Sequence, residues 1–380
     1  MKKKKVLLVT SFFEEEIGYQ EVQIARVLSS MGHDVVVVTS DRSYLDKERR
    51  LNDEGSPYSI KRMKRVMRIR DTILPLQSVR KMIAALDPDA TLLIHPGHGL
   101  GYFVVDAIPK KSKVLSFFGD LRTDNKIGGI RGLKGSELIQ HSLKDRWYRK
   151  VFRRSDVVVA NTNETLELMR SIARNDLGEK LTMPGLGFDS STYFHDKSLR
   201  RKWRKNLGLT DDAIVLVTVT RVYEGKPIDK WMKPVLKALS RNTKLVYILA
   251  GFMDTPYSRK IREKVVASSN GERFHTLGFT DPAFNNVMFN GADYSLWFAP
   301  TVSIQQSMAT GLPAILPDEK TLDHLVTTGV NGFYYDSLED LADRLVGLGP
   351  WPVWRDKVAG ANRRFSYEFI LSELLTAVSD

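Results

Sequence analysis

The stretch Val6–Thr39, which reads VLLVTSFFEEEIGYQEVQIARVLSSMGHDVVVVT, decides the fold class of this chain. It opens with a continuous apolar run and closes with another, Val35–Thr39, as strands buried on both faces of a parallel sheet do. Between these runs, apolar residues recur at helical spacing from Ile24 to Met31 and stop at Gly32. A strand, a helix and a second strand in this order predict a parallel β-α-β unit.

The same alternation continues through two parts of the chain. Further strands are expected at residues 89–95, 114–118 and 156–160, and then at residues 214–220, 245–250, 274–278, 294–299 and 314–316. The segment Pro184–Asp189 and the charged stretch after it interrupt the pattern and indicate an interdomain linker. We therefore predict an α/β protein with two doubly wound, Rossmann-like parallel sheets, whose carboxyl edges face across a ligand-binding cleft. An amphipathic helix is expected over Phe365–Val378.

The amino-acid composition favours a folded protein that does not depend on cysteine and does not span a membrane. Of the 380 residues, 42% are apolar and 27% are charged, which is typical of a folded soluble chain. The absence of cysteine excludes a disulfide framework, a thiolate zinc site and a cysteine nucleophile, and it favours a reducing, intracellular location. The apolar run after the basic start is too short for a signal sequence, and no run approaches the roughly 20 apolar residues of a spanning helix. We expect a cytoplasmic protein that is soluble or sits on a membrane surface.

Positive charge is concentrated in clusters. The chain has 57 Lys and Arg against 45 Asp and Glu, which gives a formal charge of +12. One cluster lies within residues 61–81, a second is interleaved with aromatic residues over 144–154, and a third spans 197–205. Each cluster alone is explained by a solvated surface, but together they predict a polyanionic partner: anionic lipid, a phosphorylated acceptor or nucleic acid. Nucleic acid ranks last because no recognisable nucleic-acid module is present. The residues predicted to face the acceptor or the membrane are Lys61, Arg62, Lys64, Arg65, Arg68, Arg149 and Arg153.

The segment Thr220–Pro227 is the most informative candidate site. It leaves the first strand of the second domain and enters a helix, and Gly225 can close a turn that brings Arg221 and Lys226 together. Two cations at the carboxyl end of a strand suit a diphosphate, and they could neutralise a departing nucleotide without a metal. A surface loop with incidental charges explains the same residues equally well.

Other candidate groups carry weaker signals. Ser303 with Gln306 three residues later predicts a capping box and a helix whose N-terminal amides could face an anion. Asp120 follows an expected strand and could act as a base or bind an acceptor hydroxyl, with residues 14–16 as alternative acidic groups. His95 and His98 lie too near each other to define a metal site by themselves, and no metal site is predicted.

Taken in order, several motifs resemble those of the two-domain GT-B glycosyltransferases, and specifically glycosyltransferase family 4. Arg221 and Lys226 have the family's Arg-x4-Lys spacing. The other matching segments are Glu16–Asp34, Pro184–Asp189, Leu249–Gly251, Phe274–Phe279, Gln306–Pro313 and Gly329–Phe333. Two family glutamates, seven residues apart, are replaced here by Phe298 and Gln306.

The resemblance implies a metal-independent transferase that needs no cofactor and usually retains anomeric configuration. Its donor is a nucleotide-diphosphate sugar such as a UDP- or GDP-sugar, and its leaving phosphate takes the acceptor proton. It also implies an acceptor-binding domain of residues 1–186 with a crossing C-terminal helix, residues 365–380, and a donor-binding domain of residues 187–364. The donor-binding residues implied are Gly18, Arg221, Lys226, Gly251, Leu277, Gly278, Ser303, Gln306 and Met308.

The function hypothesis that follows is sugar transfer to a lipid-linked or polysaccharide acceptor in surface-glycan synthesis. The enzyme would lie on the inner face of the cell membrane, held by its basic clusters. Three alternatives remain open: a degenerate GT-B protein that binds a nucleotide or a partner without catalysis, a transferase that acts on another polyanionic acceptor, and a sugar-nucleotide epimerase of the same fold.

Overall fold

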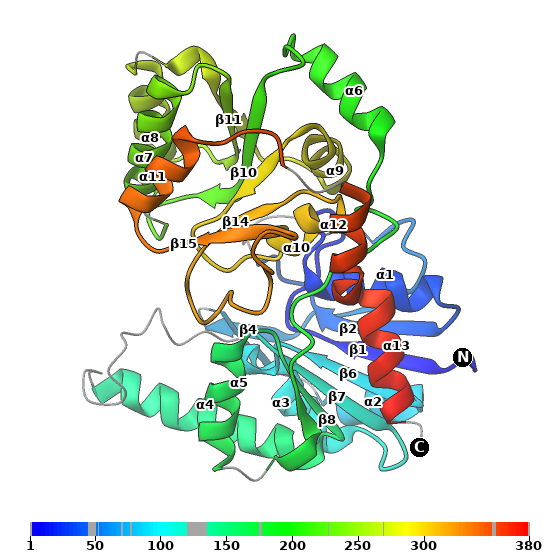
Figure 1. Cartoon of the computed structure of the whole chain (residues 1–380). Helices are drawn as coiled ribbons and strands as arrows, with labels where there is room; N and C mark the ends of the chain where they lie inside the picture. The colour runs from blue at the N-terminus through cyan, green and yellow to red at the C-terminus, as the bar shows by residue number, and fades with distance from the viewer. Residues whose placement is uncertain are drawn as a thin grey trace. The chain divides into compact units, whose positions relative to one another are not determined.

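The contacts within the chain divide it into two compact units. In the computed structural model, unit 1 comprises Met1–Leu186 with Tyr367–Asp380, and unit 2 comprises Gly187–Ser366 (Figure 1). The boundaries fall at the expected linker and within two residues of the expected start of the final helix. The structure describes residues 2–44, 51, 53–69, 71–76, 78–119, 135–174, 177–226, 228–268, 270–351 and 355–378.

Unit 1 is built on a parallel sheet in the order β3-β2-β1-β6-β7-β8-β9. The chain starts in its middle and reverses direction across the sheet after β3, as doubly wound sheets do. The strands are β1 (Lys5–Val9), β2 (Asp34–Ser40), β3 (Ser59–Met63), β6 (Ala90–Ile94), β7 (Lys113–Phe118), β8 (Val157–Ala160) and β9 (Leu181–Thr182).

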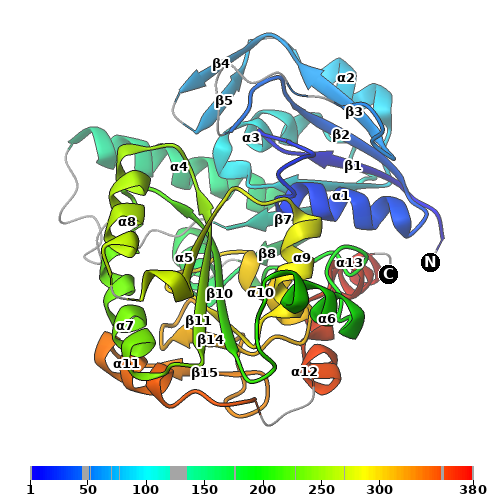
Figure 2. The same cartoon turned by 90° about the horizontal axis from the view of Figure 1, so that it is seen from above.

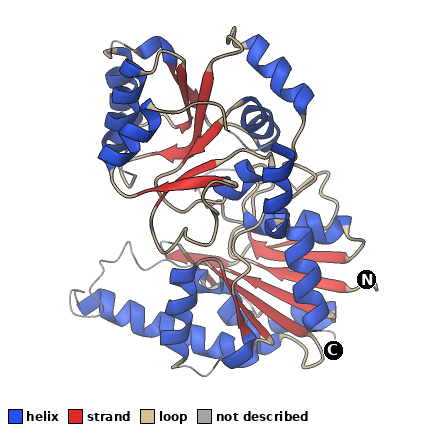
Figure 3. Cartoon of the chain, viewed as in Figure 1, coloured by secondary structure: helices blue, strands red, loops and turns tan. Residues whose placement is uncertain are grey.

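Helices cover both faces of this sheet (Figure 3). One face packs against α1 (Gln20–Ser30) and α13 (Tyr367–Ala377), so the final helix belongs to the core of unit 1. The other face packs against α2 (Arg80–Leu86), α3 (Leu100–Val104), α4 (Gly135–Arg154) and α5 (Asn163–Ala173). Short 3-10 turns lie at Pro96–His98, Val105–Ala107 and Gly178–Lys180.

A small antiparallel hairpin stands beside this layer. Its strands β4 (Val66–Ile69) and β5 (Thr72–Pro75) pair with each other, and they project at the margin of unit 1 in Figure 2. The buried side chains Val66 and Ile73 attach the hairpin to the core. The sequence did not predict the hairpin, because each of its strands is only four residues long.

Unit 2 repeats the architecture with a six-stranded parallel sheet in the order β12-β11-β10-β13-β14-β15. Its strands are β10 (Ile214–Val222), β11 (Leu245–Phe252), β12 (Phe274–Gly278), β13 (Tyr294–Leu296), β14 (Ala314–Pro317) and β15 (Gly332–Tyr335). One face packs against α7 (Ile228–Arg241), α8 (Pro256–Val266) and α11 (Leu338–Val346). The opposite face packs against α6 (Lys197–Asn206), α9 (Pro282–Gly291) and α10 (Ser303–Ala309), and α12 (Arg355–Asn362) contacts α10. Further 3-10 turns lie at Gly271–Arg273 and Arg363–Phe365.

The predicted pair of parallel α/β domains is confirmed, because the apolar runs form the central strands of both sheets. The main differences are at the sheet edges. The edge strand β3 has alternating exposed and partly buried residues and lacks the apolar run of a central strand. A second difference concerns the inner strand β13, which ends at Leu296, three residues before its predicted end.

We predict that Gly251→Ala destabilises unit 2. Gly251 has φ +108°, and a Cβ there would overlap the carbonyl oxygen of Thr220 on the neighbouring strand. Backbone strain and this overlap should lower the free energy of unfolding by about 2–4 kcal/mol in urea unfolding. Gly360→Ala is the control, because a Cβ there meets nothing within 4 Å. Equal stability of both variants would contradict the close approach of β11 to β10.

Candidate functional site

Two cations lie close to the carboxyl end of β10. Arg221 is the next-to-last residue of this strand, and Lys226 lies in the loop that follows it. The backbone N–H of Lys226 donates to the carbonyl of Tyr223 at 2.9 Å, which closes the predicted turn. The Lys226 ammonium then reaches back and donates to the hydroxyl of Thr220. A Cβ at Gly225 would overlap the exposed ring of Tyr223, so this ring would have to move to accommodate a larger residue. Pro227 lies outside the described residues.

Neither cation is neutralised by a neighbour. The Arg221 guanidinium lies 5.6 Å from the centre of the Tyr223 ring, and within the described residues neither Arg221 nor Lys226 pairs with a carboxylate. Burial and the charge of Arg221 lower the pKa of Lys226 from its usual 10.5 to about 8. A bound anion would therefore stabilise the protonated form of Lys226 and raise its pKa again.

Two neighbouring strands end beside β10 and bring the other expected donor-side residues to the same edge. Ala250 and Phe252 of β11 pair with Leu277 and Gly278 of β12, and the register shifts at Gly251. Leu277 is half-buried and Gly278 is exposed. Because the sheet is parallel, these residues lie at the same carboxyl edge as Thr220.

The helix α10 differs from its prediction at the N-terminus. The capping box is wrong, because the helix has Val302 at its cap position and no side chain caps it. Gln306 is instead buried, and its side-chain amide has no hydrogen-bond partner within the described ranges. Met308 is also placed differently from the expectation: its side chain is fully buried in the core of unit 2 and is not available to a ligand.

An aromatic stack, which sequence reasoning missed, lies beyond the end of β13. Phe298 stacks on Trp231 of α7 with ring centres 4.3 Å apart and an interplanar angle of 7°. Ser295 pairs with Val217, so counting three residues along both strands brings Phe298 level with Thr220. The residue that replaces a family glutamate thus belongs to a rigid apolar pair at the edge that carries the cations. Only the tertiary packing of α7 on the sheet could reveal its partner.

The carboxyl edge of unit 1 gathers uncharged polar side chains. A Cβ at Gly119 would crowd both the imidazole of His95 and the amide of Asn161, so these side chains close over the end of β7. Asn161 and Gln20 exchange reciprocal hydrogen bonds of 3.0 and 3.3 Å. Asp120 lies outside the described residues. In the described ranges, no three His, Asp or Glu side chains gather in a way that could hold a metal ion.

The acidic residues after β1 have distinct structural surroundings. Glu14 is buried and accepts hydrogen bonds from the Ser43 hydroxyl at 2.8 Å and the Tyr44 N–H at 2.6 Å. Glu15 pairs with Arg26 at 2.7 Å. Glu21, which the sequence did not single out, is buried in the first turn of α1, and its burial followed by the charge of Glu14 raises its pKa from 4.5 to about 7.

Two of the residues expected to face the acceptor or the membrane instead make hydrogen bonds, and in one case an ion pair, within unit 1. Arg62 pairs with Asp53 at 2.6 Å and donates to the carbonyls of Ser40 and Phe13. Arg68 donates to the carbonyls of Ser43 and Tyr44 and lies over the ring of Phe12. Their guanidinium groups hold loops together, which corrects the expectation that they face a ligand.

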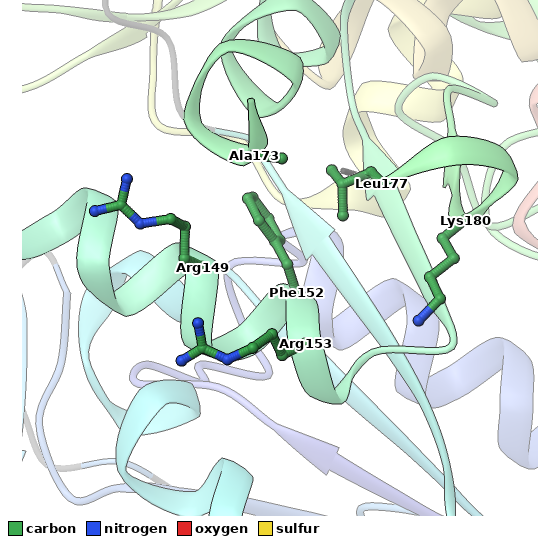
Figure 4. Close-up of a pocket in the computed structure, with 6 residues that line it drawn as sticks. All are labelled: Arg149, Phe152, Arg153, Ala173, Leu177 and Lys180. Atoms are coloured by element: carbon green, nitrogen blue, oxygen red, sulfur yellow. The ribbon is translucent and has the colours of Figure 1, made fainter. Parts of the chain in front are cut away.

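The other basic residues of this prediction remain accessible. Lys61, Lys64 and Arg65 are exposed. Arg149 and Arg153 line a pocket of unit 1 with Lys180 (Figure 4). No helix in the described part of the chain combines the length and apolar character that crossing a bilayer requires.

The sequence of unit 1 matches a known family. The model of "Glycosyltransferase Family 4" matches residues 22–177. This match confirms the resemblance inferred from the motifs of unit 1. A stretch of 150 residues is also 24% identical to alpha-monoglucosyldiacylglycerol synthase of Acholeplasma laidlawii, and it covers 38% of this chain and 37% of that relative's length.

Solved structures extend the likeness of the fold to both units. Sucrose-phosphate synthase from Thermosynechococcus elongatus is similar with a TM-score of 0.69, 15% identity and coverage of 99% of each chain. HepE of Anabaena, solved in complex with UDP and glucose, is similar with a TM-score of 0.71, 15% identity, and coverage of 99% of this chain and 100% of that chain. The chain therefore has the GT-B fold of these proteins.

We predict that Glu21→Gln stabilises unit 1 increasingly as pH rises. A carboxyl with a folded pKa near 7 and an unfolded pKa near 4.5 holds its proton more tightly when folded. Wild-type stability should therefore fall between these pH values, by up to about 3 kcal/mol relative to Glu21→Gln. Urea unfolding at pH 5, 6, 7 and 8 measures this difference. The exposed Glu179→Gln is the control, and a constant difference for Glu21→Gln would contradict its protonation in the fold.

Proposed function

We propose that this protein is a metal-independent glycosyltransferase that uses a nucleotide-diphosphate sugar and retains anomeric configuration. The observation that carries the proposal is the uncompensated pair Arg221 and Lys226 at the carboxyl edge of unit 2. Negative charge grows on the diphosphate as the bond to the sugar breaks, and two fixed cations stabilise that charge. The leaving phosphate oxygen would accept the proton of the acceptor hydroxyl as the new glycosidic bond forms.

The rest of the edge suits the nucleotide. The buried Gln306 amide, which lacks a hydrogen-bond partner within the described ranges, can accept from a ribose hydroxyl. The exposed backbone at Gly278 can approach the base. The HepE structure contains UDP and glucose, which supports UDP as the first nucleotide to test here. We propose a lipid-linked or polysaccharide acceptor, in line with the lipid in the name of the curated relative.

Arg221→Ala and Lys226→Ala should each lower the rate of sugar release from the preferred donor by at least about 100-fold. A thermal-shift panel of UDP, GDP, ADP and their sugars first identifies that donor, because a bound ligand stabilises the folded state. Lys230→Ala, an exposed lysine of α7, is the control and should retain the wild-type rate. Near-normal rates in both variants would refute the diphosphate role. Donor binding without sugar release in the wild type would support the binding-only alternative.

We also propose that the hairpin β4–β5 attaches unit 1 to an anionic membrane surface. Met67, Ile69 and Leu76 are 43%, 52% and 65% exposed on and beside this hairpin. The exposed cations Lys64 and Arg65 immediately precede β4. Apolar side chains next to cations match the interface of a bilayer that contains anionic lipid.

The double variant Met67→Ser/Ile69→Ser should bind anionic vesicles at least about tenfold more weakly than the wild type, because it removes apolar area that lipid would bury. Flotation with vesicles of phosphatidylglycerol and phosphatidylcholine measures the binding. Added salt should weaken wild-type binding. Val266→Ser, which alters an 80% exposed side chain of unit 2, is the control. Unchanged flotation of the double variant would exclude the hairpin as the attachment.

A further inference from the structure

A pocket of unit 1 combines an apolar floor with a cationic rim. Its volume is about 310 Å³, and its floor is made by the buried side chains Phe152, Ala173 and Leu177. Arg149 and Arg153 extend from α4 on one side of Phe152, and Lys180 approaches from the other side (Figure 4). The two arginines are four residues apart, so they lie on one face of the helix, one turn from each other.

This pocket lies at the amino edge of the sheet. The helix α4 ends at Arg154, directly before β8 begins at Val157, and Lys180 directly precedes β9. Because β8 and β9 are parallel, both strands start at the same edge. The polar residues His95 and Asn161 lie at the opposite, carboxyl edge. The pocket is therefore separate from the residues expected to serve the acceptor in unit 1.

The cations of α4 differ in how they are used. Lys150 pairs with Asp106 at 2.5 Å, and Arg154 donates to the carbonyls of Pro109 and Ser112. Arg149 and Arg153 have no such partner within the described residues. Lys180 donates only to the backbone carbonyl of Ser155, at 3.3 Å. Lys150 and Arg154 therefore stabilise the packing of the helix, whereas Arg149 and Arg153 at the pocket have no anionic partner among the described residues.

We infer that this pocket binds the phosphate group of an anionic lipid. Each guanidinium group can bind oxygens of a phosphate ester in a bidentate manner, and the ammonium group of Lys180 adds positive charge on the other side of Phe152 (Figure 4). The floor of Phe152, Ala173 and Leu177 accommodates the glycerol and the first methylene groups, which inorganic phosphate lacks. The inference rests on the proposed association with lipid but does not require the hairpin or the transfer reaction.

The test is calorimetric titration of the whole chain with dihexanoyl phosphatidylglycerol below its micelle concentration. This lipid should bind at a single saturable site, and Arg149→Ala/Arg153→Ala should weaken its binding at least about tenfold. Arg146→Ala is the matched control, because Arg146 is an exposed residue of the same helix that does not line the pocket. Its affinity should stay within about twofold of the wild type. Thermal unfolding verifies that the variants remain folded.

Two further titrants identify the source of the phosphate. Inorganic phosphate should bind at least about tenfold more weakly than the lipid, because it cannot use the apolar floor. Dihexanoyl phosphatidylcholine should also bind more weakly, because its choline cation repels the rim. Equal affinities for inorganic phosphate and the anionic lipid would overturn the assignment to lipid, and so would the absence of saturable binding. An Arg146→Ala effect as large as that of the double variant would show a diffuse basic face in place of a site.

The titration separates this inference from the other proposals. Monomeric lipid offers no bilayer, so loss of vesicle flotation by the hairpin variant leaves the result unaffected. The readout is binding, so an inactive transferase would not change it either.

Discussion

Two cations at the end of one buried strand have no carboxylate partner among the residues that the structure describes, and the candidate site of unit 2 is built around this pair. Burial and mutual repulsion make this arrangement costly, as the lowered pKa of Lys226 indicates. Local structure maintains it: the Thr220 hydroxyl accepts from the ammonium, the turn at Tyr223 closes the loop, and Gly251 lets β11 approach the same backbone. A bound anion would stabilise such a loop, and under the proposed function that anion is the diphosphate of the donor.

The polar groups at the carboxyl edge of the unit 1 sheet differ from the cations of unit 2. Asn161 and Gln20 satisfy each other, and burial raises the pKa of Glu21 to about 7, so this carboxyl holds a proton over much of the neutral range. Glu14 is anchored by Ser43 and Tyr44. Under the proposed function, uncharged polar groups on one unit suit an acceptor hydroxyl, whereas the cations of the other suit the donor.

The basic residues of unit 1 have three different structural surroundings. Arg62 and Arg68 each donate to two backbone carbonyls, which is possible because one guanidinium offers five N–H groups. Lys64 and Arg65 precede an exposed apolar hairpin. Arg149 and Arg153 border a cavity. Net charge therefore describes the whole surface poorly, and the chemistry of each cation depends on the groups it meets in the fold.

The sequence by itself determined the two parallel sheets, because strands buried on both faces must be continuously apolar and the helices between them must repeat at helical spacing. It also determined the Arg221–Lys226 turn, since a strand end, a glycine and a helix start are local features. It could not determine that β3 pairs with β2, or that Arg62 donates to the carbonyls of Ser40 and Phe13, because these contacts join residues that are distant along the chain. The β4–β5 hairpin is local, but its strands of four residues each are too short to give a clear pattern. Only the packing of helices on the sheets determined three other features: the stack of Phe298 on Trp231, the burial of Met308 and the raised pKa of Glu21. The physical reason is that burial and neighbouring charge are properties of the tertiary structure.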